Sequence, residues 1–449
     1  MWVLLSDRWV HRPDGEDHHD DHEYAGTTVI TRAERTYDPA DVSSREFWSL
    51  TATGRERTFA ELRANRPVSW HRPAEDLLVE DPNDQGFWAV VRHADLVEVT
   101  RRHGDFLSGE GVAFESFPKE MLDVGQGFIA MDPPRHTKIR RLLTAAFTPK
   151  QMARIEQDII ANAGRIVDNI ADKGQIDFVE EVAALVPMHN ICDMAGVPER
   201  YRQVIAEESK LVDGWRDPEL LQGAEPTARL FQALATLRQI AGELIAERRC
   251  KPGNDLLTSL VAAEFDGERL TDDEIVSAFT LLMVAGNDTT RQSISHGMKA
   301  LTDFPDQRAW LMEDLAGRMP SAVEEIVRWA TPIMTFRRTA ARDCELAGQH
   351  ITAGDKVILF YASANWDTDV FEHPERFDLS RSPNKHVSFG GGGIHHCLGN
   401  QLARKQLTAT FRAVLTRLPD IQVVGEPVYG AGNFFHTVKS MTARYSPER

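Results

Sequence analysis

The sequence predicts a mainly α-helical fold with small β-sheets, and three observations support that prediction. Apolar residues recur at helical spacing through most of the chain from about residue 45 onward. One helical segment, from about 271 to 301, is apolar through its second half and spans roughly 31 residues, about 46 Å at 1.5 Å per residue. Strand-like pieces are short, near 86–93, 336–347 and 356–361. A helix this long and this apolar must cross the core rather than lie on the surface.

The other helices are expected to follow one another along the chain. The segment 107–133 is rich in Gly, Pro and Phe and lacks a clear period, so we expect a long loop there. The long helix begins with a capping box, because Thr271 at the N-cap is followed three residues later by Glu274. The remaining helices are expected near residues 57–65, 94–103, 137–147, 150–173, 177–195, 199–212, 225–249, 320–331 and 399–418.

The organisation of the chain indicates one large domain. The chain has 449 residues, and no long Pro/Gly/Ser-rich or single-sign stretch divides it after about residue 45. We therefore expect a single domain over 45–449, preceded by a flexible N-terminal extension over 1–44. Residues 9–24 place four histidines among six acidic residues, a composition that also suits a metal-binding tract. The lack of apolar periodicity favours a solvated, disordered extension.

Charge and cysteine content narrow the class of protein. The formal net charge is −17, which opposes binding to nucleic acid or to anionic membrane surfaces. No run of 18 or more apolar residues exists, so no transmembrane helix is expected. Four cysteines in a chain this long form no disulfide framework. We therefore expect a reduced, cytoplasmic protein.

A glycine-rich loop ends in a lone cysteine. Residues 388–399 read SFGGGGIHHCLG, and the glycines allow backbone conformations and close approaches that a Cβ forbids. Cys397 lies just before a predicted helix, where the helix dipole and free N–H groups stabilise a thiolate. A flat ligand lying over the loop would need the glycines for clearance. This pattern favours a thiolate-ligated heme over a structural cysteine. A zinc site with His395 and His396 is disfavoured, because the chain lacks a paired CxxC elsewhere.

A polar cluster interrupts the long apolar helix. Residues 285–290 read AGNDTT, and all but the alanine are poor helix formers, the glycine alone costing about 1 kcal/mol. Buried polar groups also cost desolvation unless they are satisfied, and such local conflicts are expected at functional sites. An acid with solvent access beside a hydroxyl suits the delivery of protons to oxygen where water is excluded. A helix kink with internally bonded Thr side chains is the alternative.

Together these motifs resemble the cytochrome P-450 family, over roughly residues 45–445. The FGGGGxHxC form has Phe389 eight residues before the cysteine, where the commonest family spacing is seven. This longer form resembles bacterial enzymes that hydroxylate the terminal methyl of branched lipids and sterol side chains. The resemblance implies the cytochrome P-450 fold, with the long helix crossing a heme b whose iron is held by Cys397. It also places Phe389 and Gly391 in the cofactor-binding loop.

The resemblance assigns roles to several polar and charged residues. Asp288 is implied to be the proton-relay acid and Thr289 the alcohol beside it. A buried structural triad is implied for Glu325, Arg328 and Arg376, from an ExxR pair and the later HPERFD segment. Removing one member should leave a buried charge unpaired, at a cost on the order of 3–5 kcal/mol. The heme propionates are expected to be bound by His136, Arg140, Arg338 and His395.

The implied activity is that of a heme-dependent monooxygenase. Such an enzyme inserts one atom of O2 into a C–H bond of an apolar substrate, here a methyl-branched lipid, terpenoid or steroid. No GxGxxG follows a strand, so electrons from NAD(P)H are expected through a separate ferredoxin or flavodoxin and its reductase. The windows 136–154 and 379–419 contain several basic residues and no acidic one. A basic surface there would steer an acidic redox partner to the heme's thiolate side.

Substrate contacts are implied by the resemblance alone. They are expected from apolar side chains of the long loop, the long helix, the segment after the ExxR pair and the C-terminal region: Phe114, Phe117, Leu282, Met283, Ala285, Met334, Phe336, Phe434 and Phe435. Two other functions also fit a heme site, a peroxide-driven peroxygenase on the same fold and a non-catalytic heme-binding protein. Neither needs an acid–alcohol pair, so Asp288 and Thr289 count against both.

Overall fold

The computed structural model describes residues 2–5, 8–11, 35–75, 77–78, 81–114, 117, 122, 127–146 and 149–448. The chain divides into two compact units, Met1–Thr36 and Tyr37–Arg449. In the first unit, strand β1 (Trp2–Leu5) pairs antiparallel with β2 (Arg8–His11). The predicted His/Asp-rich tract beyond His11 lies outside the described residues. The second unit begins before the predicted boundary at residue 45, and the Val42 side chain is already buried within it.

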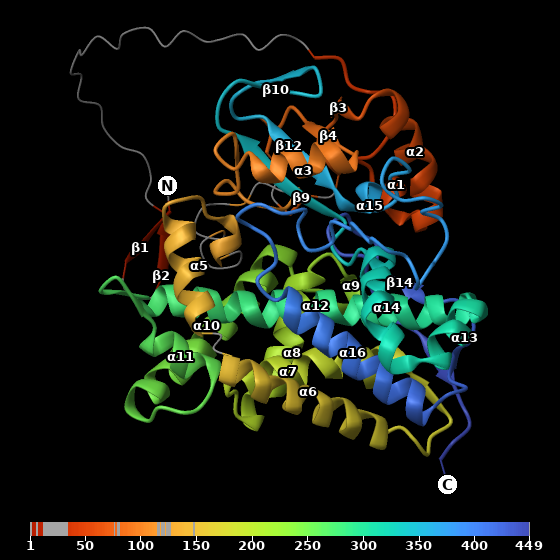
Figure 1. Ribbon diagram of the computed structural model, residues 1–449. Helices are drawn as coiled ribbons and strands as arrows, with labels where there is room; N and C mark the ends of the chain where they lie inside the picture. Colours follow the sequence, from red (N-terminus) through yellow and green to blue (C-terminus); the bar gives the residue numbers. More distant parts are fainter. Residues whose placement is uncertain are drawn as a thin grey trace, which may run out of the picture. The chain divides into compact units, whose positions relative to one another are not determined.

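Helices make up most of the second unit (Figure 1), which confirms the predicted fold class. In chain order they are α1 (Arg45–Ser49), α2 (Ala52–Asn65), α3 (His93–Arg101), the 3₁₀ turn η2 (Gly127–Ala130), α5 (Arg135–Ala146), α6 (Pro149–Asp168), the π-helical turn η3 (Val179–Ala183), α7 (Leu185–Ala195), α8 (Glu199–Asp213), α9 (Pro218–Leu221), α10 (Pro226–Cys250), α11 (Leu256–Ala262), α12 (Asp272–Asp303), α13 (Pro305–Glu313), α14 (Leu315–Ala330), α15 (Tyr361–Ala364) and α16 (Asn400–Arg417).

The strands of the second unit form small sheets. The largest has the order β3–β4–β12–β9–β5, in which β4 and β12 are parallel and the other neighbours antiparallel. A second sheet has the order β13–β16–β6, and β7–β8, β10–β11 and β14–β15 are two-stranded. The strands are β3 (Val68–His71), β4 (Phe87–Val90), β5 (Phe106–Leu107), β6 (Gln175–Asp177), β7 (Glu264–Phe265), β8 (Glu268–Arg269), β9 (Thr335–Ala340), β10 (Cys344–Leu346), β11 (Gln349–Ile351), β12 (Lys356–Phe360), β13 (Gln422–Val423), β14 (Val428–Tyr429), β15 (Val438–Ser440) and β16 (Thr442–Arg444).

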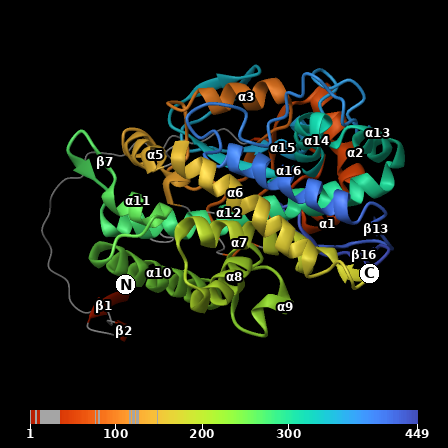
Figure 2. The same ribbon diagram turned by 60° about the horizontal axis from the view of Figure 1, so that its bottom comes forward.

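The long helix α12 crosses the helical part of this unit, as predicted. Its capping box is confirmed: the Glu274 N–H donates to Thr271 Oγ1 at 3.2 Å, and the Thr271 N–H donates to Glu274 Oε2 at 2.9 Å. In Figure 1, α12 runs through the middle of the helices and contacts α7, α8, α10, α14 and α16. Figure 2 shows α6 and α16 side by side across this bundle. Within the described residues, none of the helices combines the length and apolar character that a membrane crossing requires.

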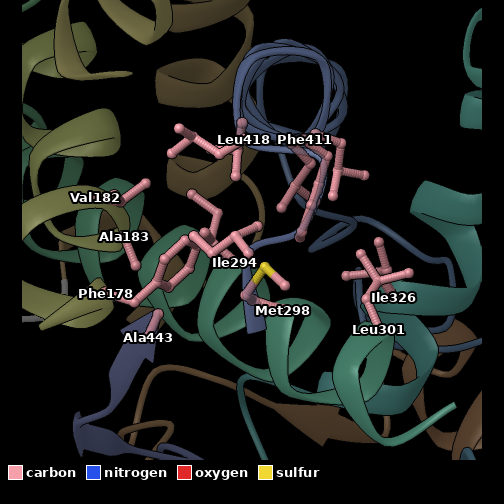
Figure 3. Close-up of a cluster of buried hydrophobic side chains, with 14 of the residues drawn as sticks. Phe178, Val182, Ala183, Ile294, Met298, Leu301, Ile326, Phe411, Leu418 and Ala443 are labelled. Atoms are coloured by element: carbon pink, nitrogen blue, oxygen red, sulfur yellow. The ribbon is translucent and has the colours of Figure 1, made fainter. Parts of the chain in front are cut away.

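The C-terminal half of α12 lies in a large cluster of buried apolar side chains (Figure 3). Ile294 and Met298 of α12 lie in this cluster with Phe411 of α16 and Ile326 of α14. Gly297 allows the close approach, because a Cβ there would lie 2.7 Å from the Phe411 ring and 2.8 Å from Ile326. This packing fixes α12 against α14 and against α16, the helix that directly follows the cysteine loop.

Several predicted helices have different bounds from those expected: α2 begins at Ala52 rather than near 57, and α6 ends at Asp168 rather than near 173. Helix α14 begins at Leu315 rather than near Pro320, because Asp314 Oδ1 caps it by accepting from the Gly317 N–H at 2.9 Å. The expected helix over 177–195 is interrupted, since β6 pairs with β16 and the π-helical turn η3 precedes α7.

Candidate active site

The cysteine lies in a loop that its own backbone closes. The Cys397 N–H donates to the Phe389 carbonyl at 2.9 Å, and the Gly390 N–H donates to the Val387 carbonyl at 2.7 Å. Asn400, the first residue of α16, donates through Nδ2 to the Cys397 carbonyl at 2.7 Å. These bonds hold the thiol just before the N-terminus of α16, where the sequence places it.

The glycine run packs the loop against helix α3. All four glycines have positive φ, a conformation that residues with a Cβ rarely adopt. A Cβ at Gly393 would lie 2.1 Å from the Thr100 carbonyl oxygen, and one at Gly391 would lie 3.0 Å from Leu96. Gly391, which was expected to bind the cofactor, therefore faces α3. Gly390 lines the cavity described below.

Opposing effects act on the Cys397 thiol. Burial raises its pKa, while a hydrogen bond from the Gly399 N–H and the charges of Arg140 and Arg404 lower it. The net pKa lies above the usual value, so the helix terminus and the two cations do not by themselves hold a thiolate. A bound metal ion deprotonates a coordinating thiol outright.

One face of α12 opens onto a cavity. Although α12 is mostly buried, Leu282, Ala285 and Thr289 are partly exposed at helical spacing, and all three line the cavity. The Thr289 hydroxyl donates to the Ala285 carbonyl at 3.0 Å. The internally bonded threonine that the sequence left as an alternative is therefore present. It does not remove Thr289 from the cavity wall, because the hydroxyl oxygen can still accept a hydrogen bond there.

Asp288 is buried beside Thr289 in an ion pair with Arg291, one turn further along α12. The Gln292 amide donates to both carboxylate oxygens of Asp288, at 3.2 and 3.3 Å. The Gln292 side-chain oxygen accepts from the Val438 N–H at 2.7 Å, which ties this cluster to β15. The acid and the alcohol are thus adjacent, but a cation that the sequence did not reveal holds the acid.

The two histidines expected near the cofactor lack protein partners for several ring nitrogens. Among the described residues, neither His136 nitrogen nor His395 Nδ1 has a hydrogen-bond partner, although all three atoms are buried. The two rings lie 4.2 Å apart. Burial, together with the charges of neighbouring arginines, lowers the pKa of His136 to about 4 and that of His395 to about 2. An anionic group would satisfy these nitrogens and favour their charged forms.

The two arginines expected to bind the propionates, Arg140 and Arg338, also lie near the cysteine loop. Arg140 lines the cavity and donates through Nη2 to the His396 carbonyl at 2.6 Å, so it also braces the loop. Arg338 is buried in β9, where burial lowers its pKa and its Nη1 donates to the Arg337 carbonyl at 2.7 Å. No carboxylate among the described residues is ion-paired with Arg338, so its buried guanidinium suits an anionic ligand.

A buried ion pair supports the loop from α14. The side chains of Glu325 and Arg328 are 0% exposed, and Arg328 donates to both Glu325 oxygens at 2.8 and 2.7 Å. The third cation is Arg381, whose Nε donates to Glu325 Oε2 at 3.1 Å. The expectation that Arg376 fills this place is wrong. Its N–H closes a turn onto the His373 carbonyl, which leaves its side chain exposed, and it joins the network only through its carbonyl oxygen.

Asn365 connects this charged network to the cysteine loop. Its Nδ2 donates to Ser388 Oγ at 2.8 Å and to Thr331 Oγ1 at 2.9 Å. Its Oδ1 accepts from the Val387 N–H at 2.9 Å, and its carbonyl accepts from Arg328 Nη1 at 2.9 Å. One buried amide therefore couples α14 to the segment that enters the glycine run.

Cys397 and the open face of α12 share one cavity of about 780 Å³. The expected substrate residues that line it are Phe117, Leu282, Ala285, Phe336, Phe434 and Phe435. The other three expected residues, Phe114, Met283 and Met334, are not among the residues that line the cavity and lie in buried apolar clusters instead. Because α12 is apolar on most sides here, apolar character alone does not separate its cavity face from its core face.

These residues fit a flat, anionic prosthetic group held through a thiol. The cavity contains the thiol, Gly390 of the glycine run and a mainly apolar wall. Buried cationic or unpartnered nitrogen groups of His136, His395 and Arg338 suit carboxylates. Heme b, with its iron and two propionates, has this combination of features.

The class of protein follows from comparison with known families. The sequence profile of the cytochrome P-450 family matches residues 83–419, and the chain belongs to this family. It is therefore a heme-thiolate monooxygenase that uses O2 and hydroxylates apolar molecules. Members of the family draw reducing equivalents from redox partners.

Particular relatives narrow the comparison. The chain is 38% identical over 429 residues to the methyl-branched lipid omega-hydroxylase of Mycobacterium tuberculosis, covering 94% of this chain and 99% of the relative. It is 38% identical over 394 residues to the steroid C26-monooxygenase of Rhodococcus jostii, and the match covers 86% of this chain and 81% of that relative. The solved cytochrome P-450 CYP268A2 of Mycobacterium marinum, in complex with pseudoionone, is 57% identical with a TM-score of 0.88, covering 92% of this chain and 100% of that chain.

Sequence reasoning missed several residues of this site. Arg381 stands only five residues after Arg376, and no local pattern distinguishes which arginine is turned inward. Arg291 lies at the i+3 position from Asp288, a spacing that could have suggested the ion pair. Asp213, at the end of α8, also lines the cavity, and it lies just beyond the predicted helix 199–212 in no motif that would single it out.

Proposed function

We propose that this chain hydroxylates a methyl-branched aliphatic or isoprenoid molecule, with Cys397 as the protein ligand of the heme iron. The observation that carries the proposal is the shared cavity. It is lined by the Cys397 thiol, by the open face of α12 and by Phe336, Phe434 and Phe435. When bound, the heme supplies oxygen activation. The residues of this chain hold the cofactor, exclude water, orient the substrate and move protons.

The cofactor would be held at two kinds of contact. Cys397 would bind the iron from a loop kept in place by Asn365 and the Glu325–Arg328 pair. His136, Arg338 and His395 would bind the propionates, because each presents a cationic or unpartnered buried nitrogen. Arg140 would add positive charge at the same place while bracing the loop carbonyl of His396.

Proton delivery would pass from Asp288 to the Thr289 hydroxyl. Thr289 lines the cavity, whereas Asp288 is buried one residue before it. Asp288 is ion-paired with Arg291, so this ion pair would have to open before the carboxyl group could turn toward the Thr289 hydroxyl. The Thr289 hydroxyl faces the cavity from the same turn of α12 as the acid, which suits it to pass a proton into the cavity.

The substrate class rests on the cavity lining and on the relatives. Phe336, Phe434 and Phe435 form a connected set of aromatic rings, with centroids 5.3 Å apart for Phe336 and Phe434 and 4.8 Å for Phe434 and Phe435. Such a wall suits branched hydrocarbon better than a polar ligand. The relatives act on methyl-branched lipid or steroid, and the similar solved enzyme binds pseudoionone. We infer attack at a terminal methyl group.

A ferredoxin is the proposed electron donor, and the chain is proposed to work in the cytoplasm, where its four free cysteines stay reduced. Much of the predicted basic surface is internally neutralised: Lys138 pairs with Glu268, and Lys405 pairs with Glu156. Arg141 and Lys385 are exposed within the same two windows. These two side chains are therefore the proposed contacts for an acidic partner.

The partner proposal is tested by charge reversal. Arg141→Glu with Lys385→Glu should slow heme reduction by a surrogate ferredoxin at low salt and flatten the salt dependence of the rate. Lys251→Glu, an exposed change of the same sign elsewhere, is the control. Unchanged rates and salt dependence in the double variant would remove this surface from the proposal.

The substrate proposal is tested by binding and product analysis. The purified heme-loaded chain is titrated with pseudoionone, a methyl-branched fatty acid and a sterol, following the heme absorption shift. Turnover with a surrogate ferredoxin and reductase then identifies the hydroxylated carbon by mass spectrometry. The proposal expects binding of at least one branched compound and oxygen insertion at its terminal methyl. Exclusive attack on ring carbons, or tight binding of polar compounds alone, would contradict it.

A further inference from the structure

Arg404 of α16 stacks on the residue whose carbonyl closes the cysteine loop. Its guanidinium carbon lies 4.4 Å from the centroid of the Phe389 ring. The Phe389 carbonyl in turn accepts from the Cys397 N–H at 2.9 Å. A guanidinium within about 6 Å of a ring centroid is attracted to the face of that ring. One side of the loop is therefore held by a charged side chain from the helix that follows it.

The same guanidinium reaches the other side of the loop through Asn400. Arg404 Nη1 donates to Asn400 Oδ1 at 2.8 Å, and Asn400 Nδ2 donates to the Cys397 carbonyl at 2.7 Å. Phe389 thus binds the backbone N–H of Cys397, and Asn400 binds its carbonyl. Because Arg404 contacts both of these residues, the position of Cys397 depends on where one guanidinium is held.

A carboxylate from a neighbouring helix holds that guanidinium. Glu324 of α14 accepts from Arg404 Nε at 2.6 Å and from Arg404 Nη2 at 2.9 Å. Two parallel hydrogen bonds of this kind fix the orientation of a guanidinium as well as its position. The side chains of Arg404 and Glu324 are 28% and 27% exposed, so solvent screens their charges only in part.

This ion pair is distinct from the buried network that begins at the next residue of α14. Glu325 reaches the entrance of the cysteine loop through Arg328 and Asn365. Glu324 reaches the end of the loop that carries the cysteine, through Arg404. Two adjacent acids of α14 therefore support the two ends of the loop, and only one of these supports places a cation next to the contacts of Cys397.

The charge of Arg404 acts on the cysteine itself. Burial raises the pKa of the Cys397 thiol, and the charges of Arg140 and Arg404 are among the effects that oppose this rise. A cation that favours a thiolate also favours additional negative charge on an iron bound to that thiolate. One-electron reduction adds one negative charge to such a centre. A fixed cation beside it therefore raises the reduction potential, and a fixed anion lowers it.

We propose that the ion pair of Arg404 and Glu324 sets the reduction potential of the heme bound at Cys397. The inference rests on the proposed role of Cys397 as the ligand of the heme iron. Arg404 acts through Cys397, so it is a positioning residue. Its positive charge favours the reduced centre, the negative charge of Glu324 opposes this effect, and removal of either partner leaves the other charge uncompensated. The two removals should therefore shift the potential in opposite directions, which a purely structural support would not do.

The test is the reduction potential of the heme-loaded chain, measured anaerobically with redox dyes. Arg404→Gln should lower the ratio of reduced to oxidised heme about tenfold at a fixed potential, which is a shift of about 59 mV to lower potential for one electron. Arg404→Lys keeps the charge and should stay nearer to wild type. Glu324→Gln should shift the potential upward. Arg412→Gln removes the same charge from an exposed position about two turns further along α16 and should match wild type.

The signs of these shifts decide the inference. An unchanged or raised potential in Arg404→Gln would overturn it, as would an unchanged or lowered potential in Glu324→Gln. A potential in Arg404→Lys as low as that of Arg404→Gln would also overturn it, because the charge would then be irrelevant. If Arg404→Gln binds no heme, the sign of the Glu324→Gln shift decides alone. A wild type that lacks the red-shifted carbon monoxide band of a thiolate-ligated heme would instead contradict the proposed function.

Discussion

Replacing Arg381 with alanine should destabilise the protein far more than replacing Arg376. The Arg381 side chain is 9% exposed and pairs with the 0% exposed Glu325. It also donates to the carbonyls of Glu372, His373 and Arg376, at 2.8, 3.2 and 3.2 Å. A hydrogen bond to a charged group contributes about 1.5–3 kcal/mol. Glu325 keeps Arg328 as a partner in the Arg381→Ala variant. The free energy of unfolding should therefore fall by about 2–4 kcal/mol, near or below the roughly 3–5 kcal/mol that breaking a buried ion pair completely costs.

Arg376→Ala is the matched comparison, because it removes the same charge from an exposed position in the same segment. Its side chain makes none of these contacts, and the expected change is within about 0.5 kcal/mol. Urea unfolding of both variants, followed by circular dichroism at equal heme loading, measures the difference. If Arg376→Ala were the more destabilising change, the assignment of the third cation to Arg381 would be refuted.

Three further outcomes follow from the site. Thr289→Val removes the hydroxyl at nearly constant side-chain volume. The yield of hydroxylated product per NAD(P)H consumed should fall roughly tenfold to a hundredfold, while the fraction of oxygen released as hydrogen peroxide rises. An unchanged product yield would contradict the proton path through Thr289. His136→Phe should speed heme transfer to apomyoglobin, yet leave the heme-free chain as stable or more stable, because it removes two unpartnered buried nitrogens; slower heme loss would be the contrary result. Burial disfavours the charged Glu324 carboxylate, but His386 and Arg404 outweigh it and lower its pKa to about 2 from 4.5. This depressed pKa contributes on the order of 3 kcal/mol of folding stability above pH 4.5, and that contribution is lost as the pH falls toward 2. Glu324→Gln should therefore lower the free energy of unfolding at pH 7 and have little effect near pH 2. An equal effect at both pH values would contradict this role of Glu324.

Local signals predicted the elements that local chemistry determines. The capping box at Thr271 and Glu274 located the start of α12, and the glycine run with Cys397 located the loop before α16. Both depend on residues that are neighbours in the chain. The start of α14 was not predicted correctly, because a cap at Asp314 begins the helix at Leu315 and leaves Pro320 inside it.

The contacts that join distant segments could not be read in the same way. Arg376 and Arg381 differ only in which one a turn directs toward Glu325, a choice made by tertiary packing. Met283 and Leu282 are adjacent and equally apolar, yet one lies in the core and the other on the cavity wall. The rotation of α12 about its axis decides this, and a helix that is apolar on most sides does not encode that rotation in its pattern.

The central claim is that Cys397 holds the heme iron, and one spectrum tests it. Wild type and Cys397→Ala are reduced, exposed to carbon monoxide and compared by difference absorption. The account predicts the strongly red-shifted Soret band of a thiolate-ligated heme in wild type and its loss in the variant. A wild type that binds no heme, or a band that persists without Cys397, would contradict it.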